Sequence, residues 1–221
     1  MELEVVELPA DPALPDSCFV EDVAIVLDEV ALLTMPGAAS RREEVGAVAG
    51  ALARHRPLER VALPATLEGG DVLRVERTLY VGRSGRTNEG GIERLREVAE
   101  PHGYRVVPVR VDGCLHLKSA VTALGDERVL ANPAGADLGA FEGLEVVAVA
   151  DDEPGAANVV RVREVVLAHS GFPRTLDRLL SLGYDVRPLD VSEFLKAEAA
   201  LTCKSLLFRR RDPPSPVSPS A

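Results

Sequence analysis

The sequence repeats one structural pattern four times along its length. Each copy consists of an apolar alternating run, a short acidic or glycine-containing turn and a second apolar run, which together predict a β-hairpin. A spacing of about 40–50 residues between copies is typical of ring-like repeat architectures such as propellers. The pattern therefore favours a ring of similar α/β units over an ordinary α/β sheet with chance internal similarity. The predicted hairpins are Asp22–Thr34, Asp71–Gly82, Ser119–Asn132 and Asn158–Ser170.

Most of these hairpins are followed by a helical pattern and then by a third strand. Ser40 with Glu43 fits a capping box at the start of the first helix, and Pro173 suits the first turn of the last one. In the third unit a short stretch near 137–143 stands where a helix is expected. Each unit is thus predicted to be ββαβ. The predicted helices are Ser40–His55, Asn88–His102 and Phe172–Leu182, and the third strands are Arg60–Leu63, Arg105–Val111, Glu145–Val149 and Asp185–Leu189.

A fifth unit is predicted to be incomplete. Its first strand would be Ser205–Arg210 and its last strand Glu4–Leu8, with no second strand or helix to complete it. We therefore expect a single five-bladed α/β-propeller domain over residues 1–208, with a gap in the ring and an exposed strand edge. Residues 209–221 are rich in proline and serine, which predicts a disordered tail.

The positions just before each hairpin carry chemically useful side chains. Equivalent positions in a ring of repeats lie around one central axis, so these groups are expected to converge on one place. An imidazole, a thiol, carboxylates and an amide are a set that catalysis needs together and that an apolar core does not. The residues are Glu21, Asp22, Glu68, His116, Asn158 and Cys203.

Cys203 and His116 are the strongest candidates for chemistry. A free cysteine is usually a small buried apolar group, and a lone histidine is usually structural. Here both lie at hairpin entrances, and polar residues flank Cys203, with Lys204 placed to favour the reactive thiolate. A histidine titrates near neutral pH and can protonate a leaving amine. The pair is typical of a cysteine nucleophile with a distant acid/base.

Carboxylates and arginines complete the predicted site. The segment 16–22 interleaves Asp16, Glu21 and Asp22 with apolar residues that should be buried, so these carboxylates need a partner. A guanidinium offers forked donors that match two carboxylates. Arg41 and Arg86 could instead bind a substrate carboxylate, and an arginine-like ligand needs both kinds of contact.

Composition and motifs argue against several other classes of protein. A net charge of −10 disfavours nucleic-acid binding and suits a cationic small substrate. The chain has three cysteines, an acidic start and no long apolar run, which predicts a cytoplasmic protein without disulfides or a membrane span. No phosphate-binding fingerprint or serine-hydrolase motif is present. A metal site of Cys18, Cys114, His116 and Cys203 lacks paired ligand spacing, so no metal is expected.

Seven strings of the sequence together resemble dimethylarginine dimethylaminohydrolase, a family of the guanidino-group modifying (pentein) superfamily. They run in the family's order over nearly the whole chain, from about Val5 to Phe208. The resemblance implies a five-bladed α/β propeller, in agreement with the repeat. The strings are PDSCFVEDVAIV, PGAASRREE, LEGGDVL, VGRSGRTNEGG, LHLKSAVT, GAANVVRV and EAALTCKSLLF.

The resemblance also implies a role for each site residue. Cys203 matches the nucleophile and His116 the general acid/base. Glu68, Glu21 and Asp22 match residues at the substrate guanidinium, with Asp16 nearby. Arg41 and Arg86 match residues that hold the substrate's carboxylate end, and the main-chain carbonyl of Ala197 falls where the family contacts the α-amino group.

The activity implied is hydrolysis of N-omega-methylated arginines to citrulline and dimethylamine or methylamine, through a covalent cysteine intermediate and without a cofactor. An arginine deiminase or amidinotransferase is an alternative, although the deiminases carry an acidic residue where this chain has Lys118. Because members of the family begin with a further strand and helix, a catalytically impaired methylarginine-binding homologue is a third interpretation. The open blade has two further explanations, a true start of the protein upstream of Met1 or a partner chain that covers the gap, and the second raises the expectation of a homodimer.

Overall fold

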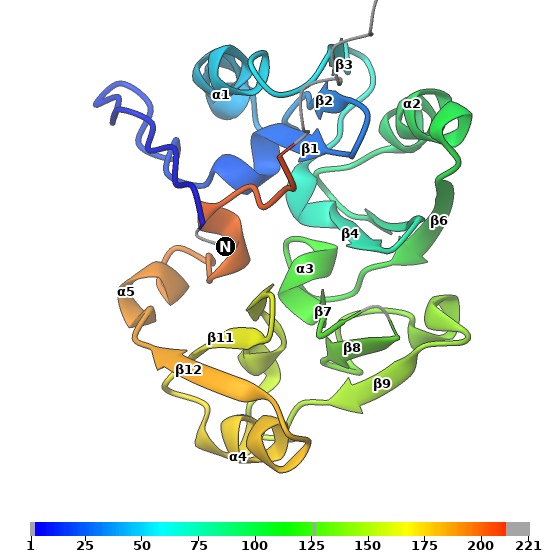
Figure 1. Ribbon diagram of the computed structural model, residues 1–221. Helices are drawn as coiled ribbons and strands as arrows, with labels where there is room; N and C mark the ends of the chain where they lie inside the picture. Colours follow the sequence, from blue (N-terminus) through cyan, green and yellow to red (C-terminus); the bar gives the residue numbers. More distant parts are fainter. Residues whose placement is uncertain (1–2, 126, 211–221) are drawn as a thin grey trace, which may run out of the picture.

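The computed structural model describes residues 3–125 and 127–210, and it contains four sheets of three strands each. In every sheet the first strand pairs antiparallel with the second, and the second pairs parallel with the third. Figure 1 shows the four sheets arranged around a common centre, with α1, α2 and α4 on the outside. The first sheet is β1 (Ala24–Val26), β2 (Ala31–Leu33) and β3 (Leu58–Arg60); the second is β4 (Val72–Val75), β5 (Thr78–Arg83) and β6 (Arg105–Arg110). The third is β7 (Val121–Ala123), β8 (Arg128–Ala131) and β9 (Glu145–Ala148); the fourth is β10 (Val160–Val162), β11 (Val165–His169) and β12 (Asp185–Leu189).

Short helical segments connect these strands. The α-helices are α1 (Val45–Leu52), α2 (Glu89–Ala99), α3 (Leu117–Ala120), α4 (Pro173–Ser181) and α5 (Ser192–Leu195). The 3₁₀ turns are η1 (Val20–Val23), η2 (Ala39–Glu44), η3 (Gly69–Asp71), η4 (Glu100–His102), η5 (Leu138–Phe141), η6 (Pro154–Ala157) and η7 (Thr202–Lys204). The third unit has η5 where the other units have a longer helix, as the sequence predicted.

Local sequence explains the outer helices. Asn88 caps α2, because its side-chain oxygen accepts a hydrogen bond from the Gly91 amide at 2.9 Å. The apolar residues Ile92, Leu95 and Ala99 recur on one face of α2 and are buried against the second sheet. Pro173 starts α4, where a missing amide hydrogen costs no helical hydrogen bond.

Two local predictions in the first unit are wrong. The segment 39–44 forms a 3₁₀ turn capped by Ala38, and no side chain closes the capping box predicted from Ser40. The side chains of Arg41 and Glu44 are buried and pair with each other. The third strand is Leu58–Arg60 and not 60–63, because its register is set by the parallel pairing with β2.

The two segments predicted to be strands of the fifth blade are not strands. Residues 4–8 and 205–210 are extended but make no ladder, and an ion pair of 2.9 Å joins Glu4 to Arg210. In the four complete blades a middle strand bonds to both neighbours, and no such strand lies between these two segments in the described part of the chain. An apolar alternating pattern without a partner for its backbone groups does not make a strand. The tail expected at 209–221 lies outside the described residues from 211 onward.

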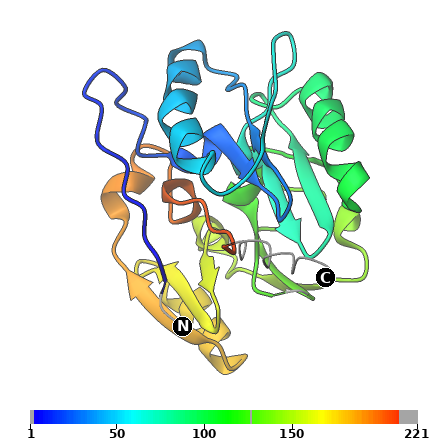
Figure 2. The same cartoon turned by 45° about the horizontal axis from the view of Figure 1, so that its top comes forward.

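Five single helical turns lie at the centre: η1, η3, α3 and η6, each just before the first strand of a sheet, and η7, just before the segment 205–210. Contacts join η1 to η3, η3 to α3, α3 to η6 and η7 to η1. Asn158 closes the ring, because its side chain both donates to Thr202 Oγ1 and accepts from the Thr202 amide, each at 3.0 Å. Figure 2 shows the same arrangement from a second direction. No helix in the described ranges is long and apolar enough to cross a membrane.

Candidate active site

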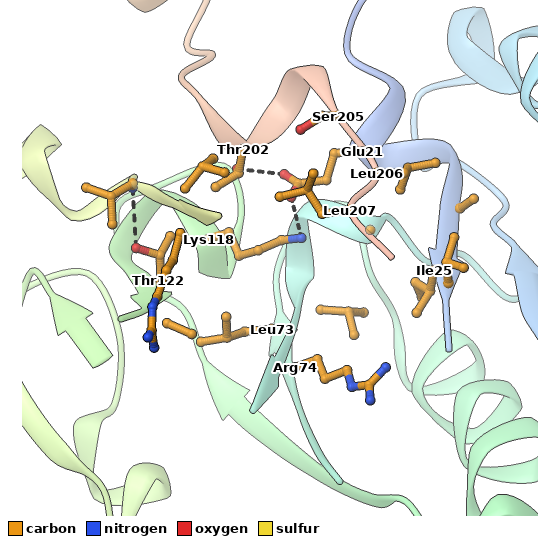
Figure 3. Close-up of a pocket in the computed structure, with 18 of the residues that line it drawn as sticks. Glu21, Ile25, Leu73, Arg74, Lys118, Thr122, Thr202, Ser205, Leu206 and Leu207 are labelled. Atoms are coloured by element: carbon orange, nitrogen blue, oxygen red, sulfur yellow. Dashed lines mark hydrogen bonds and ion pairs between the residues drawn. The ribbon is translucent and has the colours of Figure 1, made fainter. Parts of the chain in front are cut away.

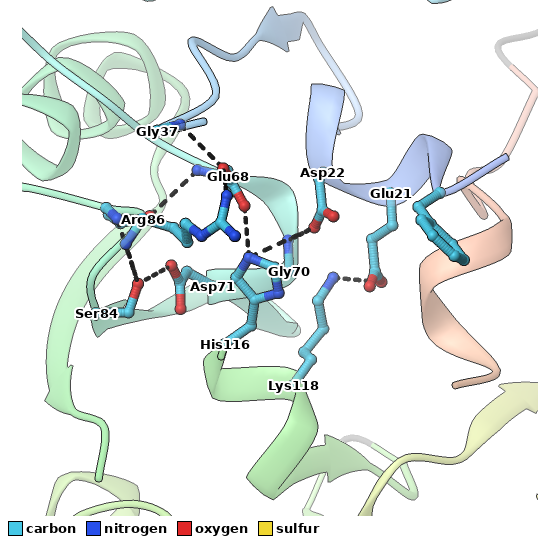
Figure 4. Close-up of polar contacts among 12 residues, drawn as sticks. Glu21, Asp22, Gly37, Glu68, Gly70, Asp71, Ser84, Arg86, His116 and Lys118 are labelled. Carbon is cyan, nitrogen blue, oxygen red and sulfur yellow. Dashed lines mark hydrogen bonds and ion pairs between the residues drawn. The ribbon is translucent and has the colours of Figure 1, made fainter. Parts of the chain in front are cut away.

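A buried imidazole–carboxylate pair lies at the centre of the ring (Figure 4). His116, the residue before α3, has its Nε2 2.6 Å from Oε2 of Glu68, the residue before η3. The other oxygen of Glu68 accepts from the Gly37 amide at 2.9 Å, so the carboxylate is held in place. Burial alone would lower the pKa of His116, but the hydrogen bond to Glu68 and the charges of Asp22 and Asp71 outweigh it and raise that pKa. The imidazole is therefore suited to hold and deliver a proton.

Asp22, on η1, lies between His116 and Arg41. Its Oδ1 accepts from the Gly70 amide at 3.0 Å and is 3.9 Å from Nε2 of His116, while its Oδ2 is 2.6 Å from Nη1 of Arg41. Arg41 is also bonded through Nε and Nη2 to Glu44. Burial would lower the pKa of Arg41, but these hydrogen bonds outweigh it and raise that pKa. In this structure the guanidinium predicted to hold a substrate carboxylate is thus held by two protein carboxylates.

A second buried ion pair lies beside the first. Oε1 of Glu21 is 2.5 Å from Nζ of Lys118, and its Oε2 accepts from the hydroxyl of Thr202 at 2.7 Å. Burial raises the pKa of Glu21, although Lys118 and Thr202 oppose that rise. This contact links the His116 turn to the Cys203 turn, because Lys118 is on α3 and Thr202 on η7.

Cys203 lies half-buried in η7, next to Thr202. Burial and then the charge of Glu21 raise the pKa of the thiol, with a further contribution from Asp22, while the Ala200 backbone and the Thr202 side chain oppose the rise. Asp22 therefore acts on both the thiol and the His116 imidazole. The Cys203 turn and the His116 turn are joined through Thr202, Glu21 and Lys118.

The remaining predicted residues are placed at the edges. Arg86 is part-exposed, with Nη1 3.6 Å from Oε1 of Glu68. Asp16 is exposed and reaches the site through its main-chain carbonyl, which accepts weakly from Arg41 at 3.4 Å. Ala197 is exposed in the turn after α5, where its amide donates to the Phe194 carbonyl at 2.9 Å. The substrate-binding roles of Arg86, Asp16 and Ala197 stay predictions.

A pocket of about 250 Å³ lies on the axis of the ring (Figure 3). Its walls are the first strands of the four sheets and the segment 205–207. Glu21, Lys118 and Thr202 also line it, whereas His116, Glu68 and Cys203 do not. The Glu21–Lys118 pair thus lines this axial pocket and also lies between the turns of Cys203 and His116.

One group of side chains could hold a metal ion by donor type. In the described residues, ligand atoms of Asp22, Glu68 and His116 lie within 4.8 Å of one another. An imidazole with two carboxylates suits several divalent metals. This set differs from the cysteine-containing set weighed from the sequence, which the structure does not assemble there.

Three residues that contribute to the site were not predicted from the sequence. Asp71 is fully buried next to His116, Thr202 binds Glu21, and Thr87 accepts from the Glu68 amide at 3.1 Å. Asp71 lies in the same Glu-Gly-Gly-Asp string as Glu68, which is the one signal that could have identified it. The hydroxyl of Thr87 gives no such signal, because its role depends on a contact across 19 positions.

No protein-family model matches the chain. It is 43% identical over 205 residues to the dimethylarginine dimethylaminohydrolase of Streptomyces coelicolor, covering 91% of this chain and 79% of that protein. It is 34% identical over 209 residues to the enzyme of the same name from Pseudomonas aeruginosa, covering 94% and 82%. A solved structure of a mutant of the Pseudomonas enzyme complexed with citrulline has a TM-score of 0.85 and 34% identity, covering 90% of this chain and 78% of that one.

The repeated three-stranded units around a central site define an α/β propeller of the pentein superfamily, which confirms the fold expected from the repeat. Two relatives identify the family within this superfamily. Each is more than 30% identical to the chain, and the chain covers more than three quarters of its length. The chain belongs to the dimethylarginine dimethylaminohydrolase family.

Proposed function

We propose that the protein hydrolyses N-omega-methylated arginines, asymmetric dimethylarginine and monomethylarginine, to citrulline and dimethylamine or methylamine. The family supports the reaction, and one observation carries the assignment of residues: Glu21 bonds both to Thr202, the neighbour of Cys203, and to Lys118, two residues after His116. A nucleophile, an acid/base and carboxylates for a cation thus lie on neighbouring turns at the centre of the ring.

The substrate cation is held by carboxylates. Asp22 and Glu68 are buried and both face the His116 imidazole, and a carboxylate oxygen can accept more than one hydrogen bond. A guanidinium there gains charge-assisted hydrogen bonds in a site of low polarity. Arg86, which is part-exposed, is the arginine available to the carboxylate end, while Arg41 orients Asp22.

The chemistry has two halves. The Cys203 thiolate attacks the central guanidinium carbon, and the bond from that carbon to the methylated nitrogen breaks as His116 delivers a proton to the leaving amine. A water molecule that loses its proton to His116 then adds to the same carbon. The added hydroxyl gives its remaining proton to solvent as the carbon–sulfur bond breaks, so that neutral citrulline leaves and the thiolate is restored. No cofactor takes part in either half.

The raised pKa values suit this sequence of events. With no cation bound, burial and the charge of Glu21 favour the protonated thiol of Cys203. A bound guanidinium brings a positive charge next to the sulfur and so favours the thiolate. The nucleophile is therefore formed mainly when substrate is present, and the raised pKa of His116 keeps a proton ready for the leaving amine.

An assay of citrulline release from asymmetric dimethylarginine tests the proposal. We expect turnover by the wild-type chain and none above background by Cys203→Ser, with binding of the substrate retained in calorimetry. Cys18→Ser, at an exposed cysteine, serves as the matched control and should keep full activity. Ammonia release from unmethylated arginine at a comparable rate, or no citrulline from a folded sample, would contradict the assignment.

We further propose that the enzyme works in the cytoplasm as a homodimer. Three free cysteines suit a reducing compartment, and the apolar side chains of Leu3, Val5 and Leu207 are exposed. Light scattering at several concentrations gives the mass in solution, and a monomer throughout rejects the dimer.

A further inference from the structure

Asp71 is a buried carboxylate to which the proposed chemistry gives no part. Its side chain is 0% exposed, at the end of the η3 turn that begins after Glu68. Burial raises the pKa of Asp71, although the nearby His116 and hydrogen bonds from Ser84, Thr87 and the Leu117 amide oppose the rise. Burying a carboxylate is costly unless it is well bonded, so a buried one needs an explanation.

Each oxygen of Asp71 holds a different element of the site (Figure 4). Oδ1 accepts from the Leu117 amide at 3.0 Å, the first residue of the α3 turn that follows His116. Oδ2 accepts from the hydroxyl of Ser84 at 2.6 Å. The Asp71 amide itself donates to the Glu68 carbonyl at 3.0 Å.

Ser84 connects Asp71 to the loop that carries Arg86. Because its hydroxyl hydrogen is directed to Asp71, the Ser84 oxygen is oriented to accept from the amides of Arg86 and Thr87, at 3.0 and 3.2 Å. The Thr87 hydroxyl accepts in turn from the Glu68 amide at 3.1 Å. The hydrogen bonds form a closed circuit through Glu68, Asp71, Ser84 and Thr87.

We propose that Asp71 is a positioning residue, whose carboxylate holds the His116 turn and the Arg86 loop at a fixed separation from Glu68. This rests on the proposed function, in which those three side chains are the acid/base, the carboxylate anchor and the partner of the imidazole. Asp71 would thereby set the distance between the groups at the substrate guanidinium and the arginine at its carboxylate end. The Asp71 side chain itself contacts neither end of the substrate.

Only an acceptor with two free oxygens fits this place. Both the Leu117 amide and the Ser84 hydroxyl donate, so an asparagine would point its NH₂ group at one donor. Ser84 could not simply reverse its role, because its oxygen already accepts from two amides. Gly82 leaves the necessary room, since a Cβ there would lie 2.6 Å from Oδ1 of Asp71.

The charge of Asp71 also acts on His116. The imidazole is faced by the carboxylates of Glu68, Asp22 and Asp71. On its own turn, Lys118 is paired with Glu21.

The other elements packed against α3 bring no competing charge. Arg74 of β4 and Arg83 of β5 are paired at the surface with Asp28 and Glu89, and β7 and η6 carry no ionisable side chain. Removing the charge of Asp71 should therefore lower the pKa of His116.

The test compares Asp71→Asn and Ser84→Ala with Asp28→Asn, a carboxylate paired with Arg74 away from the site. We expect Asp71→Asn to lower kcat and to raise KM for asymmetric dimethylarginine, with a combined loss in kcat/KM on the order of 10²-fold, as misplaced catalytic groups cause. NMR titration should show a lower pKa for His116. Ser84→Ala should raise KM severalfold and leave that pKa unchanged, and Asp28→Asn should change neither.

A purely structural role for Asp71 would lower the melting temperature and leave kcat, KM and the His116 pKa as in the wild type, and this result would overturn the proposal. If Asp71→Asn does not fold, Ser84→Ala tests the proposal in its place. An unchanged KM in Ser84→Ala would also overturn the proposal. If the wild-type chain forms no citrulline, the proposed function fails, but the His116 titration in Asp71→Asn still tests the contact that carries this inference.

Discussion

At the scale of single residues, the site places a buried imidazole among carboxylates. His116 loses hydration on burial, which disfavours its charged form, yet the bond to Glu68 and the charges of Asp22 and Asp71 more than offset that loss. The balance depends on carboxylates from two turns, Asp22 of η1 and Glu68 and Asp71 at the two ends of η3. Removing any one of them should change the protonation of the ring before it changes the fold.

Glu68→Gln tests that balance. An amide keeps the size of the side chain but removes the charge and the strong acceptor, so we expect the pKa of His116 to fall. Because the neutral ring cannot protonate the leaving amine, kcat should fall by about 10²-fold or more. NMR titration and the citrulline assay measure the two effects. Glu59→Gln, at an exposed glutamate paired with Arg94, is the control, and a variant indistinguishable from it would disprove the assignment.

Lys204 offers a second test, beside the nucleophile. Its ammonium lies 3.2 Å from the ring centroid of Phe194 and 5.9 Å from that of Phe19, and it donates to the Ala200 carbonyl at 3.0 Å. Burial lowers the pKa of Lys204, while the neighbouring Cys203 opposes this. A cation held in this way favours the thiolate.

We therefore expect Lys204→Met to raise the pKa of the Cys203 thiol further and to slow its alkylation by iodoacetamide severalfold at neutral pH. Lys204→Arg should restore most of the rate, because it keeps the charge. Lys196→Met, at an exposed lysine paired with Glu193, is the matched control. An alkylation rate that follows pH identically in all the variants would show that Lys204 has no effect on the thiol.

At the scale of elements, the single helical turns around the centre pack with almost no clearance. A Cβ on Gly69 would lie 1.9 Å from the main-chain oxygen of Glu21, and one on Gly70 would lie 2.7 Å from Nδ1 of His116. Close approach of η1 and η3 is what brings Asp22 and Glu68 to the same imidazole. The glycines are thus required by the site as well as by the fold.

Gly69→Ala should destabilise the protein more than an ordinary overpacking change, by about 3 kcal/mol or more, because the clash is with backbone. Gly46→Ala, in α1 where no atom lies within 4 Å of the added Cβ, should stabilise it by about 0.5–1 kcal/mol. Urea unfolding of both variants gives the two free energies of unfolding. A similar small change in both would show that η1 and η3 are not in such close contact.

At the scale of the whole molecule, the buried ionisable groups make stability depend on pH. The folded-state pKa of His116 is raised, so its contribution is complete below about pH 6.5 and is lost as pH rises through the folded value. Glu21 and Asp71 also have raised pKa values. The stability that they contribute is therefore complete below about pH 4 and is lost as pH rises through their folded-state values. Both effects act in the same direction.

The melting temperature is accordingly expected to be higher at about pH 6 than at about pH 8. Below about pH 4 the exposed carboxylates with lowered pKa values, such as Asp185, become protonated and their contribution is lost. His116→Asn should reduce the difference between pH 6 and pH 8, measured by calorimetry in matched buffers. A melting temperature that rises toward pH 8 in the wild type would contradict this.

Much of the architecture could be read from local patterns. Strand alternation and turn residues act between near neighbours, so the four hairpins, the helices α2 and α4, and the short third unit follow from the sequence. The ring itself also follows, because equivalent units must bury equivalent faces. This is why Cys203, His116, Glu68 and Asp22 could be named together before their positions were known.

Tertiary structure decided what depends on partners distant in sequence. The segments 4–8 and 205–210 have strand-like patterns but no ladder, since a strand exists only where a second backbone satisfies it. Arg41 turned inward to Asp22 and Glu44, and Asp71 became the link between Leu117 and Ser84. Periodicity shows which face a side chain occupies, but only the packed chain determines which opposite charge or donor meets it there.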